Sequence, residues 1–343
     1  MPMSSCPRVI TLLRLLLVAA MVATLSTCGG GNSSKGPAAP SPPPPTTPPV
    51  PPVNPNRWSI TGRVVETLTN APVPGATLDL EGFGPIQADG SGAFRFESTT
   101  VPTFSPYRVT VTSAGYVPRD ARVLWRREDR TDVTIDVIRD APLFSLTFYR
   151  QLVRNGHEEP GNLRRLRRWS EPPNFYVRTV DETTGRSVEP EVLALVQEWL
   201  LRAVRMWTGW SARLESGTTS REDAPGWIRV VFVRTTENFC GRAFVGGNPG
   251  VITLNDDRCN CGSRKVPPST VVHEVGHALG FWHVADRDNV MYRQDPGGCH
   301  PSEVSGAERH HAAIAYRRPN GSRDIDTDPE TPGFLGSQIL VVD

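Results

Sequence analysis

Three histidines and one glutamate stand close together in HEVGHALGFWH, residues 273–283. His273 and His277 are four residues apart, which places both imidazoles on one face of a helix, about one turn apart. Gly280 can adopt the positive φ that ends a helix, so that His283 can fold back as a third ligand. Three neutral imidazoles suit zinc and leave one coordination position open. The spacing therefore predicts a catalytic zinc site.

Glu274 stands next to His273 and therefore lies roughly 100° around the helix from it. That angle makes Glu274 a poor third ligand but places its carboxylate beside a water on the zinc. Zinc can lower the pKa of such a water to about 7, so Glu274 can act as general base and pass the proton to a leaving amine. The competing interpretations are a helix with surface histidines and a degenerate, metal-free site. The fixed positions of HExxHxxGxxH argue against the first, and the presence of every ligand argues against the second.

Mixed strands and helices surround this segment. The active-site helix is expected to begin at Pro267 and Pro268, with Ser269 as its N-cap. Before it we expect a strand at 175–180, a helix at 190–210, a strand at 227–233 and two strands in RAFVGG and GVITLND. After it we expect a helix at 302–318 and a loose tail over 321–343, in which SQILVVD could add a short strand. This order predicts an α+β domain over residues 141–320.

HEVGHALGFWH resembles the zinc signature of the metzincin metalloproteases. NVMY, residues 289–292, resembles their Met-turn, and the spacing from His283 to Met291 is most similar to the matrixin branch. The resemblance implies a mixed twisted sheet and an active-site helix, with Met291 as an apolar floor under the zinc and Tyr292 in the specificity pocket. It also implies that a protein or peptide substrate binds as an extended strand along RAFVGGNPGVITL.

Some features of the family are not carried over. The chain contains no clear HxD-type motif for a second zinc, and residues 57–140 contain no cysteine that could block the catalytic zinc. Calcium is possible but unsupported, because four acidic residues offer hard oxygens without the spacing of an EF-hand loop. These residues are Asp256, Asp257, Asp286 and Asp288.

Residues 57–140 have a different character from the zinc segment. Short alternating or β-branched runs, separated by turns such as NAPVPG and ADGSG, predict an all-β sandwich. ITGRVVE, APVPGATLDL, DGSGAFRF and YRVTVTSAGYVPR resemble the carboxypeptidase regulatory-like domain. That resemblance implies an accessory module without carboxypeptidase chemistry. Its role could be that of a spacer or stabilising domain, or of a domain that binds sugars or proteins.

The N-terminal residues 1–27 have the pattern of an export signal, because Arg8 and Arg14 precede an apolar run too short to span a bilayer comfortably. LSTC resembles a bacterial lipobox, which implies lipidation of Cys28, a membrane anchor and a place in the cell envelope, with the outer membrane or cell surface favoured. Ordinary secretion is the alternative. Residues 28–56 follow as a linker with 11 prolines among residues 37–55. Such a segment is expected to be an extended spacer that reaches roughly 60 Å.

Four cysteines lie in the predicted zinc domain, namely Cys240, Cys259, Cys261 and Cys299. An even number in an exported chain favours two disulfides. A bridge between Cys259 and Cys261 would close a strained loop, so Cys240 is expected to pair with one of them and Cys299 with the other. A structural zinc held by these thiolates is the competing interpretation.

The charge balance gives no argument for a nucleic-acid partner. Thirty-seven basic and 36 acidic residues leave a net charge of +1 over 343 residues. The basic run of Arg164, Arg165, Arg167 and Arg168 is interpreted as a solvated face. The remaining histidines have no ligand-like spacing and are expected on the surface or in the core; they are His157, His300, His310 and His311.

Together these patterns predict a multidomain, envelope-anchored zinc endopeptidase. Two other classes remain open. One is an adhesion or binding lipoprotein in which the zinc domain is vestigial. The other is a zinc hydrolase that acts on the stem peptides of peptidoglycan. The sequence contains no readable code for the substrate or the cleavage preference.

Overall fold

The computed structural model describes residues 58–99, 106–124, 130–219, 224–257, 265–293, 301–331 and 340–342. The predicted signal, the lipidation residue Cys28 and the proline-rich linker lie outside these ranges, as do Cys259, Cys261 and Cys299. The residues from Asn54 onward form one compact unit. Within the part of the chain that the structure describes, no helix is long and apolar enough to cross a membrane.

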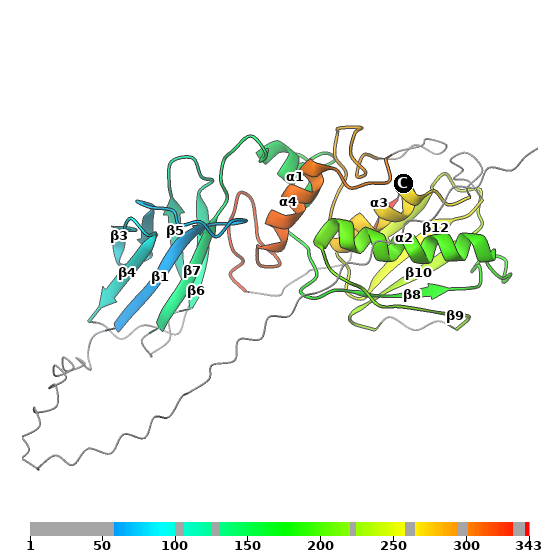
Figure 1. The fold of residues 1–343 in the computed structure, drawn as a ribbon, viewed down its shortest axis with the longest axis horizontal. Helices are drawn as coiled ribbons and strands as arrows, with labels where there is room; N and C mark the ends of the chain where they lie inside the picture. The colour runs from blue at the N-terminus through cyan, green and yellow to red at the C-terminus, as the bar shows by residue number, and fades with distance from the viewer. Residues whose placement is uncertain are drawn as a thin grey trace, which may run out of the picture. The chain divides into compact units, whose positions relative to one another are not determined.

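The first seven strands form two sheets (Figure 1). The two sheets share one apolar core. One sheet has the order β4-β1-β7, with β1 at Trp58–Glu66, β4 at Ala93–Ser98 and β7 at Arg130–Val137. The other has the order β3-β2-β5-β6, with β2 at Thr77–Leu80, β3 at Gly84–Gln87, β5 at Pro106–Thr112 and β6 at Arg119–Leu124. Alternation along the strands buries every second side chain, as with Leu78 and Leu80 in β2. The predicted all-β module is thus confirmed.

A six-stranded sheet follows, with the order β13-β11-β12-β10-β8-β9. Its strands are β8 at Asn174–Arg178, β9 at Leu214–Gly217, β10 at Trp227–Val233, β11 at Gly241–Phe244, β12 at Gly250–Asn255 and β13 at Leu340–Val342. Strands β9, β8, β10 and β12 are parallel neighbours, whereas β11 is antiparallel to both β12 and β13. Four of the seven residues of β10 are buried and none is exposed, as expected for a strand covered on both faces.

Four helices accompany this sheet: α1 at Leu146–Arg154, α2 at Pro190–Thr208, α3 at Pro268–Leu279 and α4 at Gly306–Tyr316. Helix α2 starts with Pro190 in its first turn and ends at Gly209, whose φ of 74° is left-handed. Its buried stripe includes Val196, Leu200 and Trp207, which pack in the same core as the sheet and α3. Every residue of α3 is buried, so this helix lies in the interior.

Several expectations about individual elements require correction. Helix α1 and strand β9 have no counterpart among the predicted elements. The N-cap of α3 is Pro267 and not Ser269, which lies inside the helix and is buried. The strand expected in SQILVVD is confirmed as β13. The expectation of a loose tail is wrong for residues 321–331, because several of their polar side chains are buried.

Ion pairs between two arginines and three aspartates explain why residues after α4 are buried. Arg318 pairs with Asp326 and with Asp136 of β7, while Arg119 of β6 pairs with Asp136 at 2.7 Å and with Asp328 at 3.1 Å. We call these five residues the arginine–aspartate cluster. Burial would raise the pKa of Asp136, but the two guanidinium groups outweigh it and hold the pKa below the usual value. The cluster joins the sandwich to the segment after α4.

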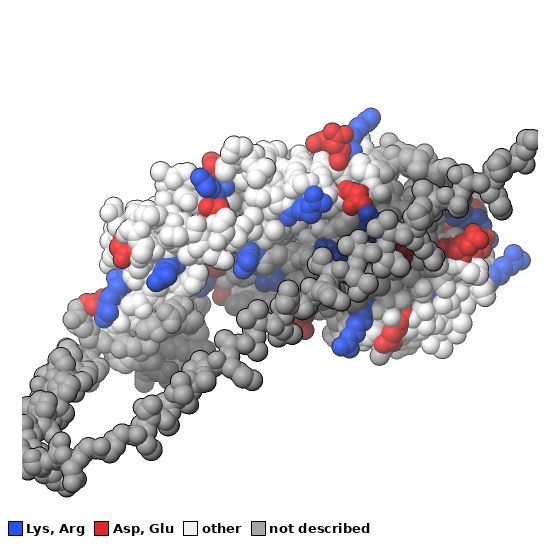
Figure 2. Space-filling view, viewed as in Figure 1, with Lys and Arg blue, Asp and Glu red and all other residues white. Residues whose placement is uncertain are grey.

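The basic run before β8 is only partly a solvated face. Arg165 is exposed, but Arg167 is 9% exposed and Arg168 donates a hydrogen bond to the carbonyl of Arg318 at 2.6 Å. On the face of the molecule drawn in Figure 2, basic and acidic side chains are interspersed.

Candidate metal centre

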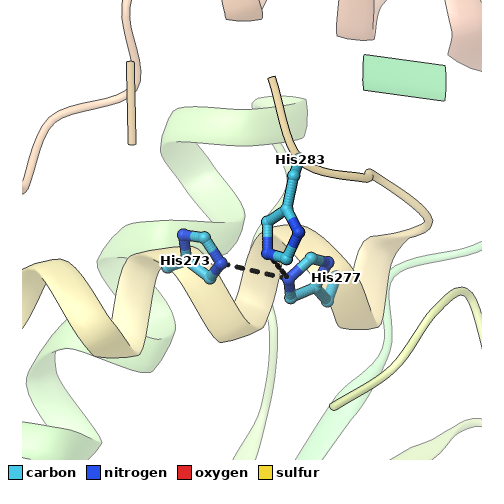
Figure 3. Close-up of side chains that lie close together, drawn as sticks. All are labelled: His273, His277 and His283. Atoms are coloured by element: carbon cyan, nitrogen blue, oxygen red, sulfur yellow. Dashed lines mark hydrogen bonds between the residues drawn. The ribbon is translucent and has the colours of Figure 1, made fainter. Parts of the chain in front are cut away.

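Helix α3 carries His273, Glu274 and His277, and all three side chains are fully buried. The helix ends at Gly280, whose φ is 110°. A Cβ atom at this position would lie only 1.9 Å from the carbonyl oxygen of Arg167. Gly280 is therefore required both by its backbone conformation and by the close approach of the loop that precedes β8. The turn that follows brings His283 back over the helix (Figure 3).

The three imidazoles converge through their Nε2 atoms. Nε2 of His277 lies 3.0 Å from Nε2 of His273 and 3.2 Å from Nε2 of His283. One ring nitrogen from each of the three residues falls within 4.8 Å of the others, and all three residues are buried. Figure 3 shows two rings rising from one helix and the third descending from the chain beyond it. The structure thus brings together the three ligands predicted from the sequence.

The opposite nitrogen of each ring faces an oxygen. Nδ1 of His273 lies 2.6 Å from the carbonyl of Val290, and Nδ1 of His277 lies 2.8 Å from the carbonyl of Phe281. Nδ1 of His283 lies 2.7 Å from Oε1 of Glu158. Carbonyl and carboxylate oxygens only accept hydrogen bonds, so each Nδ1 must carry the proton. In a neutral ring, Nε2 then presents a lone pair toward the common centre.

This donor set fits a zinc ion. Tetrahedral zinc with Zn–N distances of about 2.0–2.1 Å places two ligand nitrogens roughly 3.3–3.4 Å apart. The observed separations of 3.0 and 3.2 Å are close to that value. Converging lone pairs repel one another, and a cation between them turns this repulsion into coordination. Oxygens that hold the outer nitrogens are the usual second partners of metal-bound histidines.

Glu158 was not identified from the sequence. It lies in the loop between α1 and β8, 125 residues before His283, and its side chain is 32% exposed. The hydrogen bond from His283 is the main reason that the pKa of Glu158 lies below its usual value. No local motif marks this carboxylate, because the contact depends on how α1 and its loop fold over the site.

The Glu274 carboxylate lies against the start of β11. A Cβ atom on Gly241 would be 2.2 Å from Oε1 of Glu274, so only glycine at position 241 leaves room for this side chain. Glu274 therefore occupies a fixed place between α3 and the strand beside it. The sequence did not single out Gly241, which directly precedes the predicted strand RAFVGG.

Met291 is fully buried under the middle of α3. A Cβ atom on Gly276 would lie 2.4 Å from its sulfur, which shows how closely the thioether packs between the two ligands of the helix. The backbone N–H of Met291 donates to Glu308 of α4 at 2.8 Å. Tyr292 is partly exposed, and its hydroxyl accepts a hydrogen bond from Arg287 at 3.2 Å. Its role in a specificity pocket stays a prediction.

Among the residues that the structure describes, the other candidates are not gathered into a second group of metal-ligating side chains. Asp256 is buried in an ion pair with Arg234 at 2.8 Å, which makes a calcium role for it unfavourable. Among the described residues, the acidic candidates for calcium do not form a group of three metal-ligating side chains. Cys240 is 4% exposed, and because its three candidate partners lie outside the described ranges, the disulfide pairing stays a prediction. His311 lies in the core, and the remaining histidines were expected either there or on the surface.

One family model matches a part of the chain. Residues 59–138 match the carboxypeptidase regulatory-like domain. These residues form such a domain. The match confirms the resemblance on that segment, and the rest of the chain is not covered by it. No curated protein matches the chain.

Three solved structures resemble the chain over a small part of it. One is a protein from Bacteroides fragilis described as membrane-associated and of unknown function, with 17% identity and a TM-score of 0.20 over 24% of this chain and 28% of that one. Two cohesin–X-dockerin complexes from Acetivibrio cellulolyticus show 21% and 22% identity, with TM-scores of 0.18 and 0.17. They cover 22% and 23% of this chain, which in turn spans 51% of each of them.

Proposed function

We propose that this chain is a zinc-dependent endopeptidase with a metzincin-like, matrixin-like catalytic domain over residues 141–320. The observation that carries the proposal is the convergence of three buried Nε2 atoms, each on a ring whose Nδ1 donates to an oxygen. His273, His277 and His283 would hold the zinc. The HExxHxxGxxH spacing and the buried methionine beneath the helix support the same assignment.

When bound at these histidines, zinc supplies Lewis acidity that polarises a peptide carbonyl and makes water a stronger nucleophile. Glu274 takes the proton from the attacking water and delivers it to the nitrogen of the leaving amine. Its fixed place against Gly241 keeps the carboxylate aimed at one point and reduces the reorganisation needed during the reaction. Met291 supports the helix from below and takes no part in proton transfer.

Glu158 orients the third ligand. Its carboxylate accepts the Nδ1 proton of His283, which fixes the tautomer of that ring and increases the basicity of Nε2. The other two rings are held by backbone carbonyls, so His283 is the ligand with an anionic partner. We therefore expect Glu158 to strengthen zinc binding.

The test compares cleavage of a mixed peptide library by the purified protein and by Glu274→Gln. This change keeps the shape of the side chain but removes the base, so we expect the rate to fall by about 10²–10⁴-fold while zinc stays bound. Glu171→Gln, which neutralises an exposed carboxylate, is the matched control and should cleave like the wild type. Equal cleavage by the wild type and Glu274→Gln, or none by either, would refute the proposal. Peptidoglycan fragments in a parallel assay test the stem-peptide alternative.

The proposal includes export and a lipid anchor at Cys28, with a place in the cell envelope. The basic and apolar N-terminal pattern followed by LSTC supports this assignment. Labelling cells with palmitate should modify the wild-type chain and leave Cys28→Ser unlabelled. Labelling that persists in Cys28→Ser would exclude this anchor and favour ordinary secretion.

A further inference from the structure

Strand β11 lies directly beside the proposed catalytic helix. At its first residue, Gly241, the strand touches the Glu274 carboxylate. Just beyond its end, the N–H of Gly246 donates to the carbonyl of His277 at 2.9 Å. The strand therefore follows α3 from the proposed base to the second ligand, and a peptide paired with β11 would pass close to the zinc site.

Both edges of β11 are already paired. Strand β12 occupies one edge, and the chain's own residues 340–342, as β13, occupy the other. The β13 register joins Phe244 to Leu340, Ala243 to Val341 and Arg242 to Val342. A strand has only two hydrogen-bonding edges, so no other peptide can pair with β11 while β13 is in place.

Strand β13 runs along β11 toward the proposed catalytic base. Because the pairing is antiparallel, β13 runs from Phe244 toward the Gly241 end of β11. That end is the one that lies against Glu274. β13 thus approaches the proposed base in an extended conformation, as a substrate would have to do.

One side chain of β13 belongs to a small apolar cluster. Val341 is 9% exposed and packs with Val245 and Trp282, both of which are buried. Trp282 directly precedes the zinc ligand His283. The cluster therefore connects the side chain opposite Ala243 to the segment that positions the third imidazole.

We propose that β13 is an internal pseudosubstrate, which occupies the peptide-binding edge of the site and must leave before a substrate can bind. The substrate class follows from the same contacts: an extended peptide, antiparallel to β11, with a branched aliphatic side chain opposite Ala243. Since β13 is tethered to the site, it competes at a high effective concentration. It consists of only three residues, so it can detach without unfolding of the sheet. This inference rests on the proposed protease function, because a pseudosubstrate requires a protease site. Occupation of the β11 edge by β13 can be measured separately from cleavage.

The test uses binding of a fluorescently labelled peptide, SQILVVD, which repeats residues 337–343. Binding is measured by anisotropy on the full chain carrying Glu274→Gln, so that cleavage does not interfere. We expect Val341→Lys in this background to bind the peptide at least about ten times more tightly, because burial of a charged lysine against Val245 and Trp282 is unfavourable and β13 is released. Leu143→Lys makes the same change at a side chain that is 73% exposed and should leave binding unchanged. The peptide SQILKVD should not bind either protein.

Deletion of residues 340–343 provides a second route to the open edge and should raise peptide affinity as Val341→Lys does. Thermal melting checks that both variants are folded. Unchanged affinity in both, or equal binding of SQILVVD and SQILKVD, would overturn the pseudosubstrate inference.

With Glu274 intact, the Val341→Lys change should lower KM for a peptide substrate and leave kcat unchanged. If the opened variants bind the peptide but nothing is cleaved, the protease proposal fails and the inference that β13 occupies the edge stands. If peptides are cleaved but neither change to β13 alters binding, the pseudosubstrate inference fails and the protease proposal stands.

Discussion

Two buried polar groups of this molecule differ in how their charges are compensated. In the arginine–aspartate cluster, guanidinium groups meet carboxylates, so every cation has an anion from the same chain within ion-pair distance. At the histidine centre, three lone pairs from His273, His277 and His283 point at one another. The first arrangement is complete without a ligand. The second is an arrangement in which a cation between the nitrogens would be stabilised, and this difference separates a structural cluster from a candidate site.

Removing a ligand should have the largest effect. His283→Ala leaves two imidazoles, and we expect zinc measured by mass spectrometry after dialysis to fall from about one ion per chain to none. Peptide cleavage should fall to background with it. His157→Ala, which removes an exposed histidine, is the control and should keep its metal. If His283→Ala retains a full complement of zinc, the three histidines do not form the site.

Breaking the arginine–aspartate cluster should affect stability and leave the metal in place. Arg318→Met leaves Asp136 and Asp326 without their shared cation, which should lower the free energy of unfolding by about 3–5 kcal/mol. The adjacent Arg317 is exposed, so Arg317→Met should change the free energy of unfolding by less than about 0.5 kcal/mol. Urea denaturation of the two variants gives the comparison. Equal stability of both would mean that the cluster is not energetically coupled to the fold.

Neutralising the anionic partner of a ligand should have an intermediate effect. Glu158→Gln keeps an acceptor oxygen but removes the charge behind His283, so we expect zinc affinity to fall by about 10–100-fold in competition with a chromophoric chelator. Glu159→Gln makes the same change one residue away, at a carboxylate that pairs with Arg164, and should bind zinc like the wild type. Unchanged affinity in Glu158→Gln would restrict the role of this residue to packing.

The smallest effect is expected at His311, a buried histidine that is compensated within the chain. Its Nδ1 lies 2.7 Å from the carbonyl of Ala307, and its Nε2 accepts from the N–H of Ser145 at 2.9 Å. Burial lowers the pKa of His311 below its usual value, so its contribution to stability is present above the unfolded pKa of about 6.5 and is lost as the pH falls through the folded pKa. The free energy of unfolding should therefore decrease between pH 7.5 and pH 5.

His311→Gln should make this pH dependence shallower by at most one proton, or about 1.4 kcal/mol per pH unit. Zinc content should not change. The neighbouring His310 is less buried, and His310→Gln should alter the slope less. Parallel pH profiles for the wild type and His311→Gln would show that this ring does not titrate with folding.

The local parts of the candidate site were predictable because their geometry is set by spacing along the chain. His273 and His277 share a helix face for that reason, and Gly280 ends the helix where a left-handed residue is needed. Glu158 could not be found in this way, since its contact with His283 spans 125 residues. Gly241 makes room for Glu274 from another strand, which depends on sheet topology and not on local pattern.

The same distinction holds for the fold. Strand β10 and helix α2 have strong periodic patterns and lie close to their predicted ranges. The segment over 321–331 was expected to be loose because Asp, Pro and Gly are typical of irregular chain. Its aspartates instead meet Arg119 and Arg318, so their burial is decided by partners far away in the sequence. Composition alone does not reveal such partners.

The arginine–aspartate cluster has a consequence for cooperativity. Because Arg119 and Asp136 belong to the carboxypeptidase regulatory-like domain and Arg318 and Asp328 follow α4, separation of the two parts would break the Arg318–Asp136 and Arg119–Asp328 ion pairs. Neither part can therefore unfold without destabilising the other. We expect calorimetry to show one transition in place of two, with a calorimetric enthalpy close to the van't Hoff value. In thermodynamic terms, the N-terminal domain is then part of the folding unit that holds the histidine centre together.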